Sequence, residues 1–184
     1  LAAKDNPLAI PMTLRIGGRP YKAALQQPSG RLFVLAHGLA MNDLQWTRRG
    51  HDHGQVLARE LGFTPLYLHY NSGHHVSQNG REFAALLERL VAEWPVPVEE
   101  LVIVGHSMGG LVARSACHLG AKQRWITHLT QLVFLGTPHH GAPLERGGRL
   151  IDAALGISPY AAPLARLGQA RSAGITDLRF GNVQ

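Results

Sequence analysis

The sequence predicts an α/β fold with a mostly parallel central sheet, and two observations carry this prediction. Four short segments rich in Val, Leu, Ile and Phe lie between residues 32 and 135, and stretches with helical periodicity separate them. Nearly continuous apolar runs are typical of strands that helices cover on both faces. Strands that alternate with helices join through right-handed crossovers, so the sheet is expected to be largely parallel.

The strands are expected at residues 32–36, 65–70, 101–104 and 131–135. The first, third and fourth are the near-continuous apolar runs, and burial within the sheet follows from that pattern. A β-hairpin is predicted ahead of them, because residues 12–16 and 21–25 flank a turn rich in Gly and Pro at residues 17–20.

Three helices are predicted around these strands, at residues 53–61, 80–94 and 108–118. Asn79 and Glu82 resemble a capping box at the start of the second helix, and Pro95 marks its end. Gly120 is the expected terminator of the third helix. The second helix has apolar residues at the spacing of one helical face, namely Phe83, Leu86, Leu87, Leu90, Val91 and Trp94.

Length and composition predict one folded domain over residues 1–184. The net charge of +6 comes from scattered arginines without a basic run or interleaved aromatic residues, so nucleic-acid binding is not inferred. No apolar run approaches the roughly 20 residues that a membrane-spanning helix needs. The opening residues lack the pattern of a secretory signal, and the sequence leaves localisation and oligomeric state open.

The regular pattern loosens after Gly141. Residues 142–184 contain several prolines and glycines among short apolar clusters. Two interpretations of this segment stay open: the start of a lid or insertion over an active site, or a peripheral helix.

The strongest motif follows the third predicted strand, where Gly105, His106, Ser107, Met108 and Gly109 precede a helix. This is the G-x-S-x-G pattern of a nucleophile elbow, in which a strained strand-to-helix turn exposes the serine hydroxyl. Side chains at 105 or 109 would collide with the neighbouring strand and helix. The N–H of Met108 lies at the helix N-terminus, which favours negative charge, and is expected to form half of an oxyanion hole.

The other half of the hole is expected after the first predicted strand, where His37, Gly38 and Leu39 follow Ala36. Gly38 permits a close backbone approach, and the N–H of Leu39 is the candidate donor. Each such donor contributes roughly 3–4 kcal/mol to transition-state stabilisation. His37 is expected to hold this loop through a hydrogen bond rather than to act in catalysis.

These motifs resemble the bacterial esterase/lipase branch of the α/β-hydrolases, near the lipase-like and GPI-inositol-deacylase-like families. The resemblance covers about residues 12–145. It implies a three-layer α/β-hydrolase fold, a small-molecule or lipid ester substrate, hydrolysis through an acyl-enzyme, and no cofactor. The matching stretches are VLAHGL (34–39), GHSMGG (105–110) and LGTPHHG (135–141), with MNDLQW (41–46) and YNSGHH (70–75) resembling a less studied bacterial subgroup.

The resemblance leaves the catalytic acid and base unassigned. The triad order of this fold is Ser, then Asp or Glu, then His, and no His follows any acid after Ser107. We therefore expect the C-terminal part of the fold, with both residues, to lie beyond residue 184, and this chain alone to be weak or inactive on an activated ester. The residues considered were Glu145, Asp152, Asp177, His118, His128, His139 and His140.

The remaining candidates concern the pocket and a metal. His139 and His140 lie on a loop that shapes the pocket in the resembling lipases, and Trp46 is a candidate for the pocket mouth. Asp43 is expected to cap a local turn. The histidine pairs lack the spacing of a helical zinc site, so no metal is expected, although some related lipases carry a structural zinc.

Two other functions remain open alternatives to ester hydrolysis. One is a non-catalytic module that keeps the fold to bind a lipid or protein partner. The other is an acyltransferase that uses the same serine with an acceptor other than water.

Overall fold

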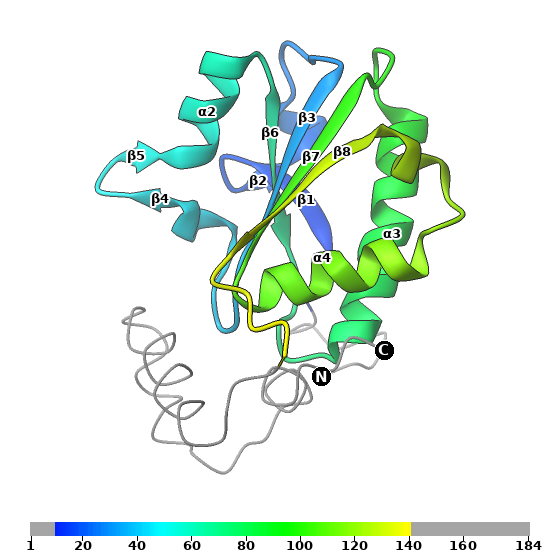
Figure 1. The fold of residues 1–184 in the computed structure, drawn as a ribbon. Helices are drawn as coiled ribbons and strands as arrows, with labels where there is room; N and C mark the ends of the chain where they lie inside the picture. The colour runs from blue at the N-terminus through cyan, green and yellow to red at the C-terminus, as the bar shows by residue number, and fades with distance from the viewer. Residues whose placement is uncertain (1–9, 141–184) are drawn as a thin grey trace.

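A computed structural model describes residues 10–140 of the protein (Figure 1). Six strands form one sheet in the order β2-β1-β6-β3-β7-β8, within the described part of the chain. β6, β3, β7 and β8 are mutually parallel, whereas β1 is antiparallel to both of its neighbours. The strands are β1 (Thr13–Ile16), β2 (Arg19–Pro20), β3 (Arg31–Ala36), β6 (Thr64–His69), β7 (Glu100–His106) and β8 (Leu129–Leu135).

Helices cover this sheet on two faces, which confirms the three-layer α/β prediction (Figure 1). α3 and α4 pack on one face and α2 on the other. A separate two-stranded hairpin, β4–β5, projects beside α2. The remaining elements are α1 (Tyr21–Ala24), η1 (Asp43–Trp46), β4 (Thr47–Arg48), β5 (His51–Asp52), α2 (His53–Leu61), α3 (Val76–Glu93), α4 (Met108–Leu119) and η2 (Arg124–His128).

The apolar runs of the central strands divide between two cores. In β3, Leu32 and Val34 face α3 and α4, whereas Phe33 and Leu35 join the smaller cluster toward α2. This alternation follows from the two-residue period of a strand, and it explains why a strand covered on both faces is apolar throughout. The four predicted strands and the helices 53–61 and 108–118 are confirmed, with ends that differ by three residues or fewer.

The prediction of a second hairpin strand at residues 21–25 is wrong. β2 covers only Arg19–Pro20, and α1 follows at once over Tyr21–Ala24. Pro20 has no N–H to donate to a sheet ladder, and it stands at the N-cap of α1. The Tyr21 ring stacks on Trp94 with centroids 5.8 Å apart, so a tertiary contact outweighs the strand preference of these residues.

The predicted start of the second helix is also wrong. α3 begins at Val76, about one turn before the expected position, and its N-cap His75 makes no side-chain cap hydrogen bond. Asn79 is buried inside the helix, where its Nδ2 donates to the carbonyl oxygen of Asn71 at 3.1 Å. The apolar face that anchors α3 starts with the buried Val76, which the spacing from residue 83 onward did not include.

β8 differs from the expectation of a fully buried strand. Val133, Phe134 and Leu135 are exposed in the described structure. β8 pairs with β7 on one side, and none of the strands within residues 10–140 pairs with its other side. Within residues 10–140, β8 is therefore the last strand on this side of the sheet, and its apolar run is less covered there than that of β7.

Candidate active site

The backbone turns sharply at Ser107, between the end of β7 and the start of α4. Ser107 has φ 51° and ψ −119°, a conformation that a residue with a Cβ rarely adopts and that costs about 1–3 kcal/mol. The surroundings hold this conformation, since the Ser107 N–H donates to the carbonyl oxygen of Leu135 at 2.8 Å. The carbonyl oxygen of Ser107 in turn accepts from the N–H of Gly110 at 3.1 Å. The strain places a half-buried serine at the N-terminus of α4.

Close backbone packing beneath the turn explains the glycines around Ser107. A Cβ on Gly109 would come within 2.5 Å of the carbonyl oxygen of His37. A Cβ on Gly105 would lie 2.5 Å from the backbone nitrogen of Gly110, which belongs to α4. Contacts below 3.0 Å with backbone atoms cannot relax cheaply, so β3, β7 and α4 approach one another here only because side chains are missing.

The loop after β3 lies against the serine. A Cβ on Gly38 would be 3.2 Å from Cβ of Ser107 and 3.0 Å from Nδ1 of His106. Leu39 is buried, and no residue between 10 and 140 accepts a hydrogen bond from its N–H. The N–H of Met108 belongs to the first turn of α4, where backbone donors have no partner within the helix.

His37 is fixed within this loop in its neutral form. Its side chain is 1% exposed, and its Nδ1 donates to the carbonyl oxygen of Gly38 at 2.9 Å. Burial lowers the pKa of His37 to about 4. The imidazole stacks on Tyr70 with centroids 4.3 Å apart, and the Tyr70 hydroxyl donates to the carbonyl oxygen of His37 at 2.8 Å. These contacts give His37 a role in shaping the loop.

A second loop supports the first. Ser72 follows β6, and its Oγ accepts a hydrogen bond from the N–H of Ala40 at 3.0 Å. Ala40 has φ 55°, so the chain leaves the β3 loop in a left-handed conformation that this hydrogen bond helps to hold. The motif at residues 70–75 therefore braces the loop that carries Leu39.

Sequence reasoning missed a buried ion-pair cluster beside this loop. Asp43 is 4% exposed, and its Oδ1 lies 2.7 Å from Nδ1 of His69 and 3.4 Å from a guanidinium nitrogen of Arg15. The expected role of Asp43 as a turn cap is wrong, because Asn42 caps η1 instead. Asn42 and Asp43 are both polar, and the sequence does not indicate which of the two side chains turns inward toward β6.

Trp46 contacts His106, the residue before Ser107. Their rings meet edge to face with centroids 6.4 Å apart, and both residues are half-buried. Burial lowers the pKa of His106. Nδ1 of His106 and Nε1 of Trp46 are buried without a hydrogen-bond partner in the described structure. Trp46 thus packs against the residue that precedes Ser107.

The loop after β8 places His139 against α4. A guanidinium nitrogen of Arg114 lies 2.9 Å from Nδ1 of His139, and the ring meets Phe134 edge to face at 4.4 Å. Because guanidinium only donates, Nδ1 accepts and the ring is neutral. Desolvation, then the charges of Arg114 and His140, lower the pKa of His139. His140 is exposed.

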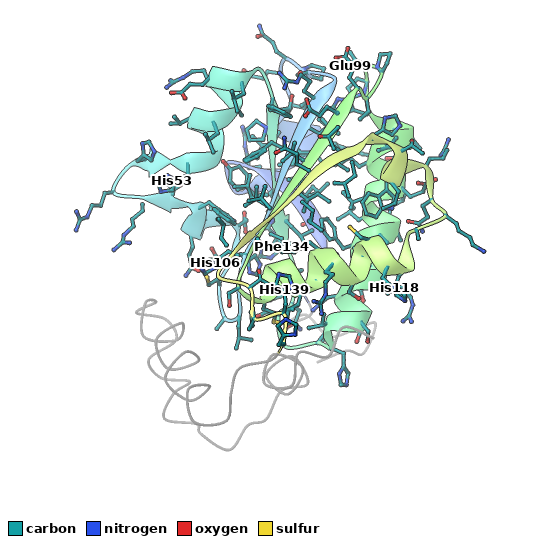
Figure 2. All side chains as sticks on the ribbon, viewed as in Figure 1. His53, Glu99, His106, His118, Phe134 and His139 are labelled. Carbon is teal, nitrogen blue, oxygen red and sulfur yellow. The ribbon has the colours of Figure 1, made fainter. Side chains whose placement is uncertain are left out.

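The other histidines after Ser107 lie away from the elbow. Figure 2 shows His106 and His139 where β7 passes into α4, and His118 at the opposite end of α4. His128 ends η2, which follows α4. Within residues 10–140, no side chain is hydrogen-bonded to Ser107 Oγ. The acids that follow in the sequence, Glu145, Asp152 and Asp177, lie outside the described residues, as does the segment 142–184 considered as a lid.

No group of three or more His, Cys, Asp or Glu side chains in the described part of the chain could hold a metal ion. Among the helices between residues 10 and 140, none combines the length and apolar character needed to cross a membrane.

A mostly parallel sheet that turns into a helix at a strained serine defines the α/β-hydrolase class of fold. The chain belongs to the family with a PGAP1-like alpha/beta domain, whose model matches residues 27–162. No curated protein matches the chain.

Solved structures agree on the fold. The propeptide form of the lipase BlEst2 from Bacillus licheniformis is similar with a TM-score of 0.60 at 23% identity, over 86% of this chain and 32% of that one. The mature form of that lipase gives a TM-score of 0.61 at 21% identity, over 94% of this chain and 62% of that one. This chain therefore spans less than two thirds of either lipase chain.

Proposed function

We propose that the protein is a serine hydrolase that cleaves carboxylic esters through an acyl-enzyme, with Ser107 as the nucleophile. The conformation of Ser107 carries the proposal. Ser107 has a positive φ, which is unfavourable for a residue other than glycine. Two hydrogen bonds hold it there: its N–H donates to the carbonyl oxygen of Leu135, and its own carbonyl oxygen accepts from the N–H of Gly110. A turn with a purely structural role would not need this unfavourable conformation. Membership in the PGAP1-like family and the lipase-like fold support the same class of reaction.

The N–H groups of Leu39 and Met108 are proposed to form the oxyanion hole. Gly38 brings the first loop against Ser107, and Met108 follows the serine directly. Both donors lie at the carboxyl ends of parallel strands, β3 and β7, that are hydrogen-bonded neighbours. The positive end of the α4 dipole adds to the field that favours an oxyanion at this point.

The proposed reaction has two acyl-transfer steps. Ser107 Oγ attacks the ester carbonyl while a base takes its proton, the alcohol leaves with that proton, and water then releases the acid from the acyl-serine. His37 and His139 do not suit the role of base. The His37 ring is buried, its pKa is lowered to about 4, and it is not hydrogen-bonded to Ser107 Oγ. Nδ1 of His139 accepts from Arg114, which leaves the ring proton on Nε2. The base and its acidic partner are proposed to lie outside residues 10–140.

Ester turnover with a matched variant tests the proposal. We expect slow release of p-nitrophenolate from p-nitrophenyl acetate or butyrate, because loss of a base alone removes most of the activity of a catalytic triad. Ser107→Ala is expected to abolish that release. Thr127→Ala, which removes an exposed hydroxyl from η2, is the control and is expected to leave it unchanged. Equal rates for the wild type and Ser107→Ala would overturn the assignment.

A further inference from the structure

Basic side chains gather on the hairpin β4–β5, outside the elbow. Arg48 pairs with His51 across the hairpin, and Arg49 and Gly50 form the two-residue turn between them. His53 begins α2, and its ring meets that of His51 edge to face at 4.6 Å. The four exposed side chains line a shallow hollow of about 550 Å³: Arg48, Arg49, His51 and His53.

The turn keeps an arginine in an unfavourable backbone conformation. Arg49 has φ 53° and Gly50 has φ 77°, so both central residues are left-handed, as a tight two-residue turn requires. Asn, Asp and Gly tolerate this conformation best, whereas other residues are disfavoured there because Cβ comes too close to the following carbonyl oxygen. A charged side chain therefore stands at the hairpin tip at a local cost to stability.

The two arginines of the hairpin, Arg48 and Arg49, lack an ion-pair partner among the described residues. Asp52 is the acid of the hairpin, and its carboxylate is already engaged. It accepts from Thr47 Oγ1 at 2.9 Å, from the N–H of Gln55 at 2.9 Å and from the Tyr67 hydroxyl. The chain as a whole has a formal charge of +6, so its field also favours an anionic partner.

Exposed leucines lie next to this basic cluster. Leu57 and Leu61 follow His53 at intervals of four residues on α2, and they are 44% and 53% exposed. This spacing places all three on one face of the helix. Leu44, in η1 just before the hairpin, is 58% exposed.

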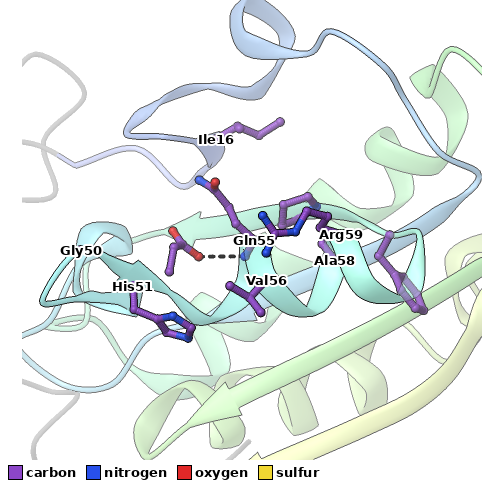
Figure 3. Close-up of a pocket in the computed structure, with 10 residues that line it drawn as sticks. Ile16, Gly50, His51, Gln55, Val56, Ala58 and Arg59 are labelled. Atoms are coloured by element: carbon purple, nitrogen blue, oxygen red, sulfur yellow. Dashed lines mark hydrogen bonds between the residues drawn. The ribbon is translucent and has the colours of Figure 1, made fainter.

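A groove continues from the hairpin along α2. Figure 3 shows Gly50 and His51 at one end of this groove and Arg59 farther along the helix. Its apolar lining includes Ile16, Val56 and Phe63. Basic groups at the mouth and apolar groups along the wall thus occur together on this side of the molecule.

We propose that hairpin β4–β5 and the outer face of α2 form a docking surface for an anionic lipid surface. Each arginine near such a surface favours binding electrostatically, while exposed leucines enter the boundary between headgroups and acyl chains. The exposed leucines favour a lipid surface over nucleic acid, because they offer apolar contact to acyl chains and none to a phosphate backbone. The hairpin follows Trp46, which contacts His106 beside Ser107, so docking would bring the lipid near the elbow.

The proposal goes beyond ester hydrolysis, and it can be tested without turnover. Co-sedimentation of the 184-residue chain with vesicles of phosphatidylcholine, with and without phosphatidylglycerol, measures docking directly. We expect binding to the anionic vesicles only, and weaker binding as salt rises. Replacing both arginines, as Arg48→Gln with Arg49→Gln, is expected to weaken binding about thirtyfold, since each contributes about 1 kcal/mol near an anionic surface.

Three further variants make the result specific. Arg81→Gln with Arg89→Gln removes the same charge from exposed positions on α3 and is expected to leave binding within about twofold. Leu57→Gln is expected to weaken binding without changing its salt dependence. Ser107→Ala is expected to bind vesicles like the wild type, which separates this proposal from the proposed hydrolysis. Equal losses in the two arginine pairs, no vesicle binding, or hairpin-dependent binding to polyuridylate instead of vesicles would each overturn it.

Discussion

The carboxylate of Asp43 lies 2.7 Å from Nδ1 of His69, although 26 positions separate the two residues. This contact joins η1 to the end of β6, and Arg15 of β1 approaches the same carboxylate oxygen. The segment that it holds begins with the loop carrying Leu39 and ends at Trp46. The shape of the candidate site therefore depends on a buried acid that does not touch Ser107.

Removing that acid should destabilise the protein. Asp43→Asn removes the buried carboxylate that faces Nδ1 of His69 and the guanidinium of Arg15, and we expect a loss of about 2–3 kcal/mol in the free energy of unfolding. Urea denaturation followed by circular dichroism measures it. Glu60→Gln, an exposed acid on α2, is the control and should change stability by less than about 0.5 kcal/mol. A loss no larger than that of Glu60→Gln would contradict the role assigned to Asp43.

The buried His37 should make stability fall in mild acid. Its pKa is about 4 in the folded protein and about 6.5 when unfolded, so between these values the unfolded chain takes up a proton that the folded protein does not. His37 thus costs no stability above pH 6.5 and about 3 kcal/mol below pH 4. The measurement compares the unfolding free energy of the wild type and of His37→Asn across this pH range. The unfolding free energy of the wild type should fall more steeply with decreasing pH than that of His37→Asn. An NMR titration placing the His37 pKa near 6.5 would refute the prediction.

The hydroxyl of Tyr70 should contribute measurably to the same loop. Tyr70→Phe leaves the carbonyl oxygen of His37 without its donor, and we expect a loss of about 1 kcal/mol in unfolding free energy. Tyr21→Phe is the matched control, because Tyr21 is half-buried and its ring stacks on Trp94. Chemical denaturation compares the two. Equal losses in the two variants would show that the hydrogen bond from Tyr70 to the carbonyl oxygen of His37 does not contribute to the free energy of unfolding.

The close packing at Gly109 should tolerate no side chain. In Gly109→Ala the added methyl group meets the carbonyl oxygen of His37, and we expect a loss of about 1–3 kcal/mol from overpacking. The backbone that holds Ser107 would shift with it, so the rate of reaction with a fluorophosphonate should fall by at least tenfold in protein that circular dichroism shows to be folded. An unchanged rate would mean that the geometry of the turn does not set the reactivity of Ser107.

The strands and the elbow were predictable from local sequence, because their signals are local. β3 and β7 are covered on both faces, so nearly all of their residues are apolar, and the strained turn requires glycine at 105 and 109. Tyr21–Ala24 became a helix against its pattern because contacts with the end of α3 decided its conformation. Asp43 and His69 could not be paired from the sequence, since η1 meets the end of β6 only in the folded chain.

The burial of β8 was also not predictable from local sequence. β8 is as apolar as its neighbour β7, yet Phe134 and Leu135 are exposed in the described structure. A run of apolar letters indicates that a strand can be buried on both faces, but not which elements cover it. The basic cluster on the hairpin was likewise not predicted, because only the turn brings Arg48, Arg49 and His51 close together.

The labelling of Ser107 by a fluorophosphonate tests the central claim most directly. The reagent phosphonylates an activated serine, and intact-mass measurement followed by peptide mapping locates the adduct. We predict a slow reaction that places its adduct on the peptide that contains Ser107, and no adduct in Ser107→Ala. Labelling of Ser107→Ala at the wild-type rate, or an adduct on another residue of the folded wild-type protein, would contradict the assignment of Ser107 as the nucleophile.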